Sequence, residues 1–138
     1  MPPEPKLPPR KTWSTEFLRF GVVGAVGFAV NVSVVYATRY WFGLYLAGFA
    51  AWMVAATVTW QLNRTWTFRS HSGRRPLHRE WAWFLAVNFA GFLLYYATYI
   101  SLVTYLSSFA AQPILAIFAG MLVSMTANFV LSRRYVFA

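Results

Sequence analysis

The chain alternates long uncharged apolar runs with short charged stretches. The uncharged run between Arg19 and Arg39 is long enough to cross a bilayer core of about 30 Å at about 1.5 Å per residue. A second run lies between Arg39 and Arg64 and begins near Gly43, a residue suited to a turn. The pattern therefore predicts two successive membrane-spanning helices in the first half of the chain.

The uncharged stretch between Glu80 and Arg133 is too long for one membrane span, so it must fold back on itself. We expect the break between Ser107 and Pro113, because polar residues suit a loop and proline suits the first turn of a helix. The expected fold class is an all-α integral membrane protein with four transmembrane helices in one domain, 13–138. The helices are expected at about 17–38, 43–63, 80–106 and 112–132, with a basic loop at 64–79.

Composition supports a membrane protein. The 138 residues are 59% hydrophobic, 20% aromatic and only 11% charged, which leaves too little polar surface for a soluble globule of this size. Twelve Lys and Arg residues face three acids, but they gather at the ends of apolar segments. Lipid phosphate is therefore the expected anionic partner, and no nucleic-acid partner is expected.

The Pro-rich, charged segment 1–12 is expected to be a disordered cytoplasmic tail.

The positions of the basic residues predict the orientation. They flank the start of the first helix, fill the loop 64–79 and follow the last helix. Only Arg39 falls on the other side of the membrane. Because cytoplasmic segments carry an excess of Lys and Arg, both termini and this loop are expected to be cytoplasmic.

The two halves of the chain share a repeat. In the motifs 62–68 and 131–137, a small polar residue precedes an arginine, and aromatic residues follow two and four positions later. Each motif is preceded by a stripe of small or polar residues, in which Ala47, Ala51, Ala55, Thr59 and Asn63 recur as Ala116, Gly120, Ser124, Asn128 and Ser132. The helix starts match as well, because Glu16, Phe20 and Gly27 recur as Glu80, Phe84 and Gly91. The fold expected is two parallel helix-pair repeats, related by a pseudo-twofold axis along the membrane normal.

The repeated arginines, Arg64 and Arg133, are candidates for binding phosphate. Guanidinium groups match phosphate oxygens with two parallel hydrogen bonds, and the sequence shows a shortage of nearby acids to neutralise them. In the alternative, both arginines only anchor helix ends at the membrane surface. The aromatics beside them belong to an interfacial belt in preference to a sugar-stacking site. The candidate headgroup-binding residues are Arg64, Arg133, Arg134, Arg19, Asn63, Trp66 and Tyr135.

Polar residues inside the predicted spans form a second candidate site. On one wall they would make a ladder of donors and acceptors for sugar hydroxyls. In the alternative, amides and small residues join transmembrane helices by hydrogen bonds and close packing, and a small-residue stripe on the first helix fits this use. The polar residues are Asn31, Asn88, Asn128 and Gln61, and the stripe is Gly21, Ala25, Ala29, Ser33 and Ala37.

No catalytic, metal or cofactor site is predicted. The only carboxylates are Glu4 in the tail and Glu16 and Glu80 at the cytoplasmic edge, so we expect no buried acid that exchanges protons and no close pair for acid-base catalysis. An ion-coupled antiporter with a membrane-embedded glutamate is therefore disfavoured. His71 and His78 lie in the basic loop without a metal-binding pattern, and the chain has no cysteine. We do not expect an enzyme.

Several of these features together resemble one family. Arg19-Phe20-Gly21, a polar residue at Asn31, Asn63-Arg64-x-Trp66-x-Phe68 and Arg133-x-Tyr135-x-Phe137 are similar, in order and spacing, to the GtrA-like family over about 15–138. The resemblance implies a multi-pass protein of the cytoplasmic (inner) membrane that serves cell-surface polysaccharide synthesis.

Two functions follow from this resemblance. In the first, the protein is a flippase that moves a polyprenyl-phosphate-linked sugar across the membrane, passively because no energy source is visible. In the second, it does not transport, and it recruits or stabilises a membrane glycosyltransferase through its small-residue stripes. A homodimer is a further expected partner, because four helices are few to enclose a path.

Overall fold

The structure is a computed structural model that describes residues 13–138, so the expected tail 1–12 lies outside the described residues. Within this range the chain forms helices and no strand. Three helical runs, Trp13–Thr67, Leu77–Tyr105 and Pro113–Val136, are long and apolar enough to cross a membrane. The elements are α1 (Trp13–Leu62), η1 (Asn63–Thr67), α2 (Leu77–Tyr105), α3 (Ser107–Ala111), α4 (Pro113–Leu131) and η2 (Ser132–Val136).

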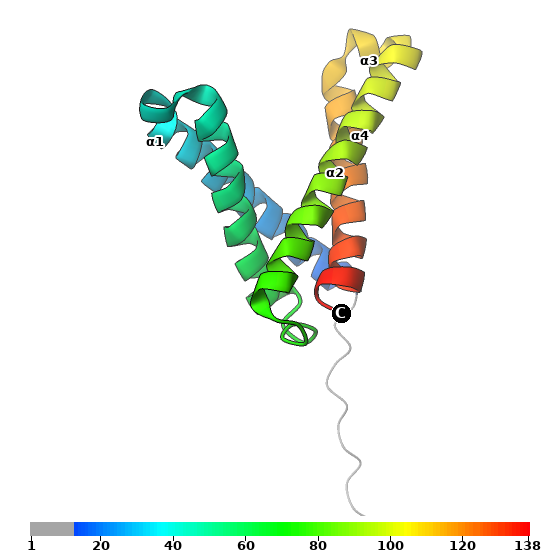
Figure 1. The fold of residues 1–138 in the computed structure, drawn as a ribbon. Coiled ribbons are helices and arrows are strands. Elements are labelled where there is room, and N and C mark those ends of the chain that lie inside the picture. Colours follow the sequence, from blue (N-terminus) through cyan, green and yellow to red (C-terminus); the bar gives the residue numbers. More distant parts are fainter. Residues whose placement is uncertain (1–12) are drawn as a thin grey trace, which may run out of the picture.

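α1 folds back on itself at Gly43. This residue has a φ of 71° and a ψ of 167°, a conformation that glycine adopts readily because it lacks a Cβ. Figure 1 shows the chain reversing between the two arms of α1, 13–42 and 44–62. The arms take the place of the first two expected helices, and the first arm extends beyond the expected end at 38.

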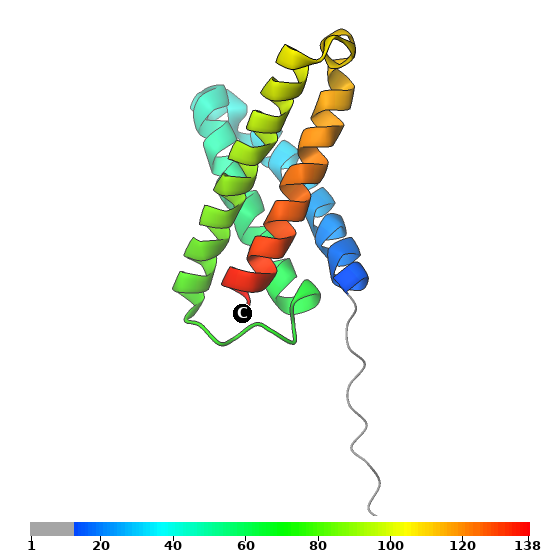
Figure 2. The ribbon, with the colours of Figure 1, turned by 90° about the vertical axis from the view of Figure 1, so that its right-hand side faces the viewer.

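The second half of the chain also folds back where the sequence predicted a break. α2 and α4 run side by side in opposite directions in both ribbon views (Figures 1 and 2). Pro113 begins α4, as expected for a residue whose missing N–H costs nothing in the first turn. The connection is not a plain loop, because the short helix α3 occupies 107–111.

The molecule therefore consists of two helix pairs, one formed by the arms of α1 and the other by α2 with α4. The pairs diverge toward Gly43 and α3 and approach each other at the opposite end, near the C-terminus (Figure 1). We call this end, which holds residues 62–68 and 131–137, the motif edge. The buried core lies there and consists of Phe20, Phe68, Phe84, Val87, Phe129, Val136 and Phe137.

Close packing within each pair uses the small-residue stripes. Ala51 and Ala116 are fully buried, and a Cβ added to Gly120 would lie 2.9 Å from the ring of Tyr95. A Cβ on Gly27 would collide with Thr59, and one on Gly91 would collide with Asn128. The stripes that lead into the motifs therefore pack inside the chain, and the expectation that they form docking faces for a partner is wrong.

The stripe on the first arm of α1 is different. Four of its members, Ala25, Ala29, Ser33 and Ala37, are exposed. Only Gly21, at its start, is half-buried, and a Cβ there would lie 3.7 Å from the sulfur of Met125.

Candidate functional site

Each motif folds into one wide helical turn. The N–H of Phe68 donates to the carbonyl of Asn63 at 2.7 Å, and the N–H of Phe137 donates to the carbonyl of Ser132 at 3.0 Å. These bonds close the π-helical segments η1 and η2, a geometry that is frequent at functional sites. Asn63 is buried and its Oδ1 accepts a hydrogen bond from the Thr67 hydroxyl at 2.8 Å, so it stabilises the turn from within.

The last aromatic residue of each motif belongs to the core. The rings of Phe68 and Phe137 stack with centroids 4.9 Å apart and an interplanar angle of 22°. Phe129 packs on Phe68 at 5.8 Å, and Phe84 packs on Phe137 at 6.2 Å. This apolar cluster fills the space between the helix pairs at the motif edge.

An ion pair beside this cluster joins Glu16 to Arg133. Arg133 Nε donates to Glu16 Oε2 at 2.6 Å; the carboxylate is fully buried and the arginine side chain is 22% exposed. The other oxygen, Oε1, lies 3.8 Å from Nδ1 of His71. The guanidinium also lies over the ring of Trp13, 4.2 Å from its centroid. Arg133 is therefore held by a carboxylate on one side and an aromatic face on the other.

A second ion pair joins Arg64 to Glu80. Arg64 Nε lies 3.0 Å from Glu80 Oε1. This is close enough for an ion pair, but the two groups are not oriented for a hydrogen bond. The same oxygen accepts a hydrogen bond from the indole N–H of Trp60 at 3.1 Å. The Glu80 carboxylate is 1% exposed and the Arg64 side chain 24% exposed.

The two ion pairs cross between the helix pairs. Glu16 opens the first arm of α1 and binds the arginine that follows α4, whereas Glu80 lies at the start of α2 and binds the arginine that follows the second arm of α1. The expectation of a shortage of acids near these arginines is therefore wrong. The two carboxylates are also buried. Both acids lie at the motif edge in ion pairs, so neither is a free acid deep in a span.

The glutamates and Trp60 were missed as site residues, although the matching helix starts gave a signal. Equivalent positions in the two halves suggested helix initiation, to which an acid in the first turn is well suited. Their role in binding arginine depends on which helix start faces which motif, and this is a property of the fold.

The remaining headgroup candidates lie near the surface of the same edge. Arg19 lies over the ring of Trp66 at 5.4 Å, and its Nη1 donates to the Trp66 carbonyl at 3.4 Å. Arg134 is exposed, with its guanidinium 5.8 Å from the ring of Tyr135. Within residues 13–138, neither arginine forms an ion pair with an acid. Their charges are therefore available to an external anion.

The intramembrane polar residues do not form a bonded ladder. Asn88 donates to the carbonyl of Phe84 in its own helix at 2.8 Å, while Gln61 is exposed and Asn31 is half-buried. Asn128 packs against Gly91, and its buried Oδ1 has no hydrogen-bond partner in the described chain. No hydrogen bond joins any two of the four across residues 13–138. The contact of Asn128 fits helix packing, and the sugar path stays a prediction.

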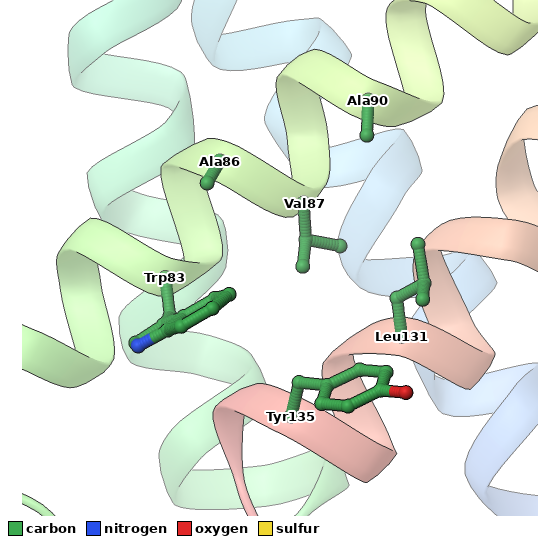
Figure 3. A pocket seen from close by; sticks show the side chains of 6 residues that line it. All are labelled: Trp83, Ala86, Val87, Ala90, Leu131 and Tyr135. Atoms are coloured by element: carbon green, nitrogen blue, oxygen red, sulfur yellow. The ribbon is translucent and has the colours of Figure 1, made fainter.

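A hollow opens beside the second motif. It has a volume of about 270 Å³, and Figure 3 shows the side chains of Trp83, Val87, Leu131 and Tyr135 converging on it. The small residues Ala86 and Ala90 leave room along the α2 side. A second hollow, of about 680 Å³, shares Leu131 and lies between α2 and α4. Both are lined almost entirely by apolar side chains.

The part of the chain that the structure describes contains no group of three or more His, Cys, Asp or Glu residues able to hold a metal ion.

Comparison with known families gives one match. The family model described as the GtrA/DPMS transmembrane domain matches residues 19–138. Among curated proteins no match was found.

Proposed function

Because the chain belongs to the GtrA/DPMS transmembrane-domain family, a family of membrane proteins of glycan synthesis, we propose that it translocates a polyprenyl-phosphate-linked sugar. The sugar lipid would cross the cytoplasmic (inner) membrane for cell-surface polysaccharide or glycan synthesis. The protein would act as a carrier that changes no covalent bond, and thus not as an enzyme.

We propose that the two arms of α1, with α2 and α4, make four crossings and place both termini in the cytoplasm. The basic residues gathered at the motif edge support this orientation. The stacking of Phe68 on Phe137 supports a parallel repeat, since two equivalent residues meet when the axis that relates the repeats passes between them.

The observation that carries the proposed function is the pair of crossed ion pairs at the motif edge. The guanidiniums of Arg64 and Arg133 each hold a carboxylate of the other helix pair, and the two arginine side chains are 24% and 22% exposed. Each carboxylate meets its guanidinium through Nε, whereas a lipid phosphate can accept two parallel hydrogen bonds from the same group. Exchanging carboxylate for phosphate would release one helix pair from the other. Binding the headgroup and loosening the motif edge would then be one event.

The displaced glutamate would restore the ion pair when the lipid leaves, so the direction of transport would come from the substrate gradient. The glutamate displaced from one arginine is buried, and leaving its charge unpaired is unfavourable, so the carboxylate competes with the phosphate and returns when the lipid leaves. Synthesis of the sugar lipid on one side and its consumption on the other would drive net transport.

A flipping assay in proteoliposomes tests the proposal, using fluorescent polyprenyl-phosphate sugars and a membrane-impermeant quencher. The wild-type protein is expected to speed flipping above that of protein-free vesicles. Arg64→Lys and Arg133→Lys are expected to slow it, because lysine keeps the charge but loses the fork. Arg74→Ala is the control, since Arg74 is an exposed loop residue outside both motifs. Flipping no faster than in protein-free vesicles would refute the translocase.

The exposed small-residue stripe of the first arm favours the alternative function, a non-transporting partner of a glycosyltransferase. Small residues let a second transmembrane helix approach closely, and Ala25, Ala29 and Ala37 are open to such a helix. Ala29→Phe is expected to abolish co-purification with the glycosyltransferase in that case. Ala110→Phe, at an exposed alanine of α3, is the matched control.

A further inference from the structure

The two halves of the molecule differ at one pair of equivalent positions beside the motifs. The register that matches Glu16 to Glu80 and Gly27 to Gly91 also matches Arg19 to Trp83. In the first half, Arg19 lies over Trp66 and donates to its carbonyl, while Trp66 stays 43% exposed.

In the second half, Trp83 takes the place of this arginine and a hollow lies beside it. Trp83 and Tyr135 stand at the sides of the hollow of about 270 Å³, and each remains nearly half exposed, at 49% and 44% (Figure 3). Ala86 and Ala90 take the places that Val22 and Val26 hold in the first half, so the α2 side of the hollow is also lined by smaller side chains. The second half therefore carries a hollow beside its motif that is lined on the α2 side by small residues.

The charge around this hollow suits an amphiphile with an anionic head. Arg134 is exposed, and its guanidinium lies over the Tyr135 ring, 5.8 Å from the centroid. Arg79 is exposed and precedes Trp83 by one helical turn, so both lie on the same face of α2. Within the described residues, neither arginine is paired with an acid.

The hollow also shares a lining residue with a second apolar hollow deeper along the helices. The second hollow, of about 680 Å³, begins at the shared Leu131 and reaches Leu94 and Leu122. Leu94 lies about 16 Å from Trp83 along α2, at about 1.5 Å per residue. A chain that enters beside Tyr135 can therefore follow an apolar surface toward the middle of the helix pair.

We propose that this groove binds the phosphate-proximal isoprenoid units of a polyprenyl phosphate, with Arg134 and Arg79 on the phosphate. This rests on the proposed function and names where the carrier lipid docks before its phosphate exchanges with the carboxylates on Arg64 and Arg133. Flat unsaturated isoprene units suit the ring faces of Trp83 and Tyr135, and the gaps at Ala86 and Ala90 accommodate their methyl branches. A polyprenyl phosphate is preferred to a phospholipid because the hollow has a volume of only about 270 Å³, and a polyprenyl phosphate carries one chain whereas a phospholipid carries two.

The experiment is a binding titration of the full chain in phosphatidylcholine nanodiscs with polyprenyl monophosphate. Ala86→Phe fills the hollow at an exposed position, and it is expected to weaken binding about tenfold or more. Val22→Phe adds a comparable ring at the equivalent exposed position of the first half and is expected to leave binding unchanged. Arg134→Gln is expected to weaken binding, whereas Arg69→Gln, at an exposed residue outside the groove, is not.

Competitors distinguish the source of the phosphate. Unlabelled polyprenyl phosphate is expected to displace the bound probe, while phosphatidylglycerol and inorganic phosphate are expected to compete poorly. Equal competition by phosphatidylglycerol, or equal loss of binding in Ala86→Phe and Val22→Phe, would overturn the proposal.

The result is separable from the proposed function. If Ala86→Phe loses binding but the wild-type protein does not flip the lipid, the site stands and the translocase fails. If the wild-type protein flips the lipid and Ala86→Phe binds normally, the translocase stands and this site is wrong.

Discussion

Phe68 and Phe137 occupy the same position in the two motifs and stack on each other at the centre of the motif edge, with ring centroids 4.9 Å apart. Both rings are almost fully buried, at 0% and 1% exposure. The aromatic residue that ends each motif therefore holds the two helix pairs together, whereas Trp66 and Tyr135, two positions earlier, remain partly exposed.

Phe137→Ala is expected to destabilise the protein by about 3 to 5 kcal/mol, because it removes a buried ring and leaves a cavity between the pairs. Unfolding in mixed detergent micelles, followed by circular dichroism, measures the change. Trp66→Ala is the matched control and should cost much less, since the ring is 43% exposed. Equal losses for the two variants would contradict a core role for Phe137.

Glu16→Ala is expected to destabilise the protein by about 3 to 5 kcal/mol, the usual cost of leaving one member of a buried ion pair uncompensated. The loss of stability is expected at the lower end of this range, because the Arg133 side chain is 22% exposed and water can partly solvate its charge. Exchanging the charges in Glu16→Arg with Arg133→Glu should recover part of the loss. A double-mutant cycle with no coupling between the two positions would show that the contact contributes nothing.

Gly91→Ala is expected to destabilise the pair formed by α2 and α4, because a Cβ there would collide with Asn128. Replacing the asparagine as well, in Gly91→Ala with Asn128→Ala, should restore much of the stability measured by thermal unfolding in detergent. Gly24→Ala is the control, because nothing lies within 4 Å of an added Cβ there. Failure of the second substitution to rescue the first would indicate a different cause.

The proposed orientation predicts where reporters will lie. A reporter fused after Ala138 and one inserted near Gly73 should both be cytoplasmic, whereas one near Ser108 should be external. Paired alkaline phosphatase and green fluorescent protein fusions measure this in cells. An external C-terminus would exclude the parallel repeat together with the orientation.

The sequence by itself determined the membrane class, the positions of the helices and the reversal at Gly43. These features depend on local properties: the length of an uncharged run, the residues that permit a turn, and a small side chain every fourth position. The stripe through Ala51 and Ala55 was visible for the same reason, but the sequence did not show that it packs inside the chain. The helix break before Pro113 was visible as well, but the short helix α3 within it carried no distinct signal.

The tertiary structure alone decided what the repeated charges do. Each of Glu16, Glu80, Arg64 and Arg133 looked like a feature of its own helix end, and nothing local indicated that they pair crosswise between the helix pairs. The hollow beside Tyr135 likewise depends on the side chain that faces the motif from the neighbouring helix, an arginine in one half and a tryptophan in the other. Such contacts join residues far apart in the chain, so they are determined only when the helix pairs meet.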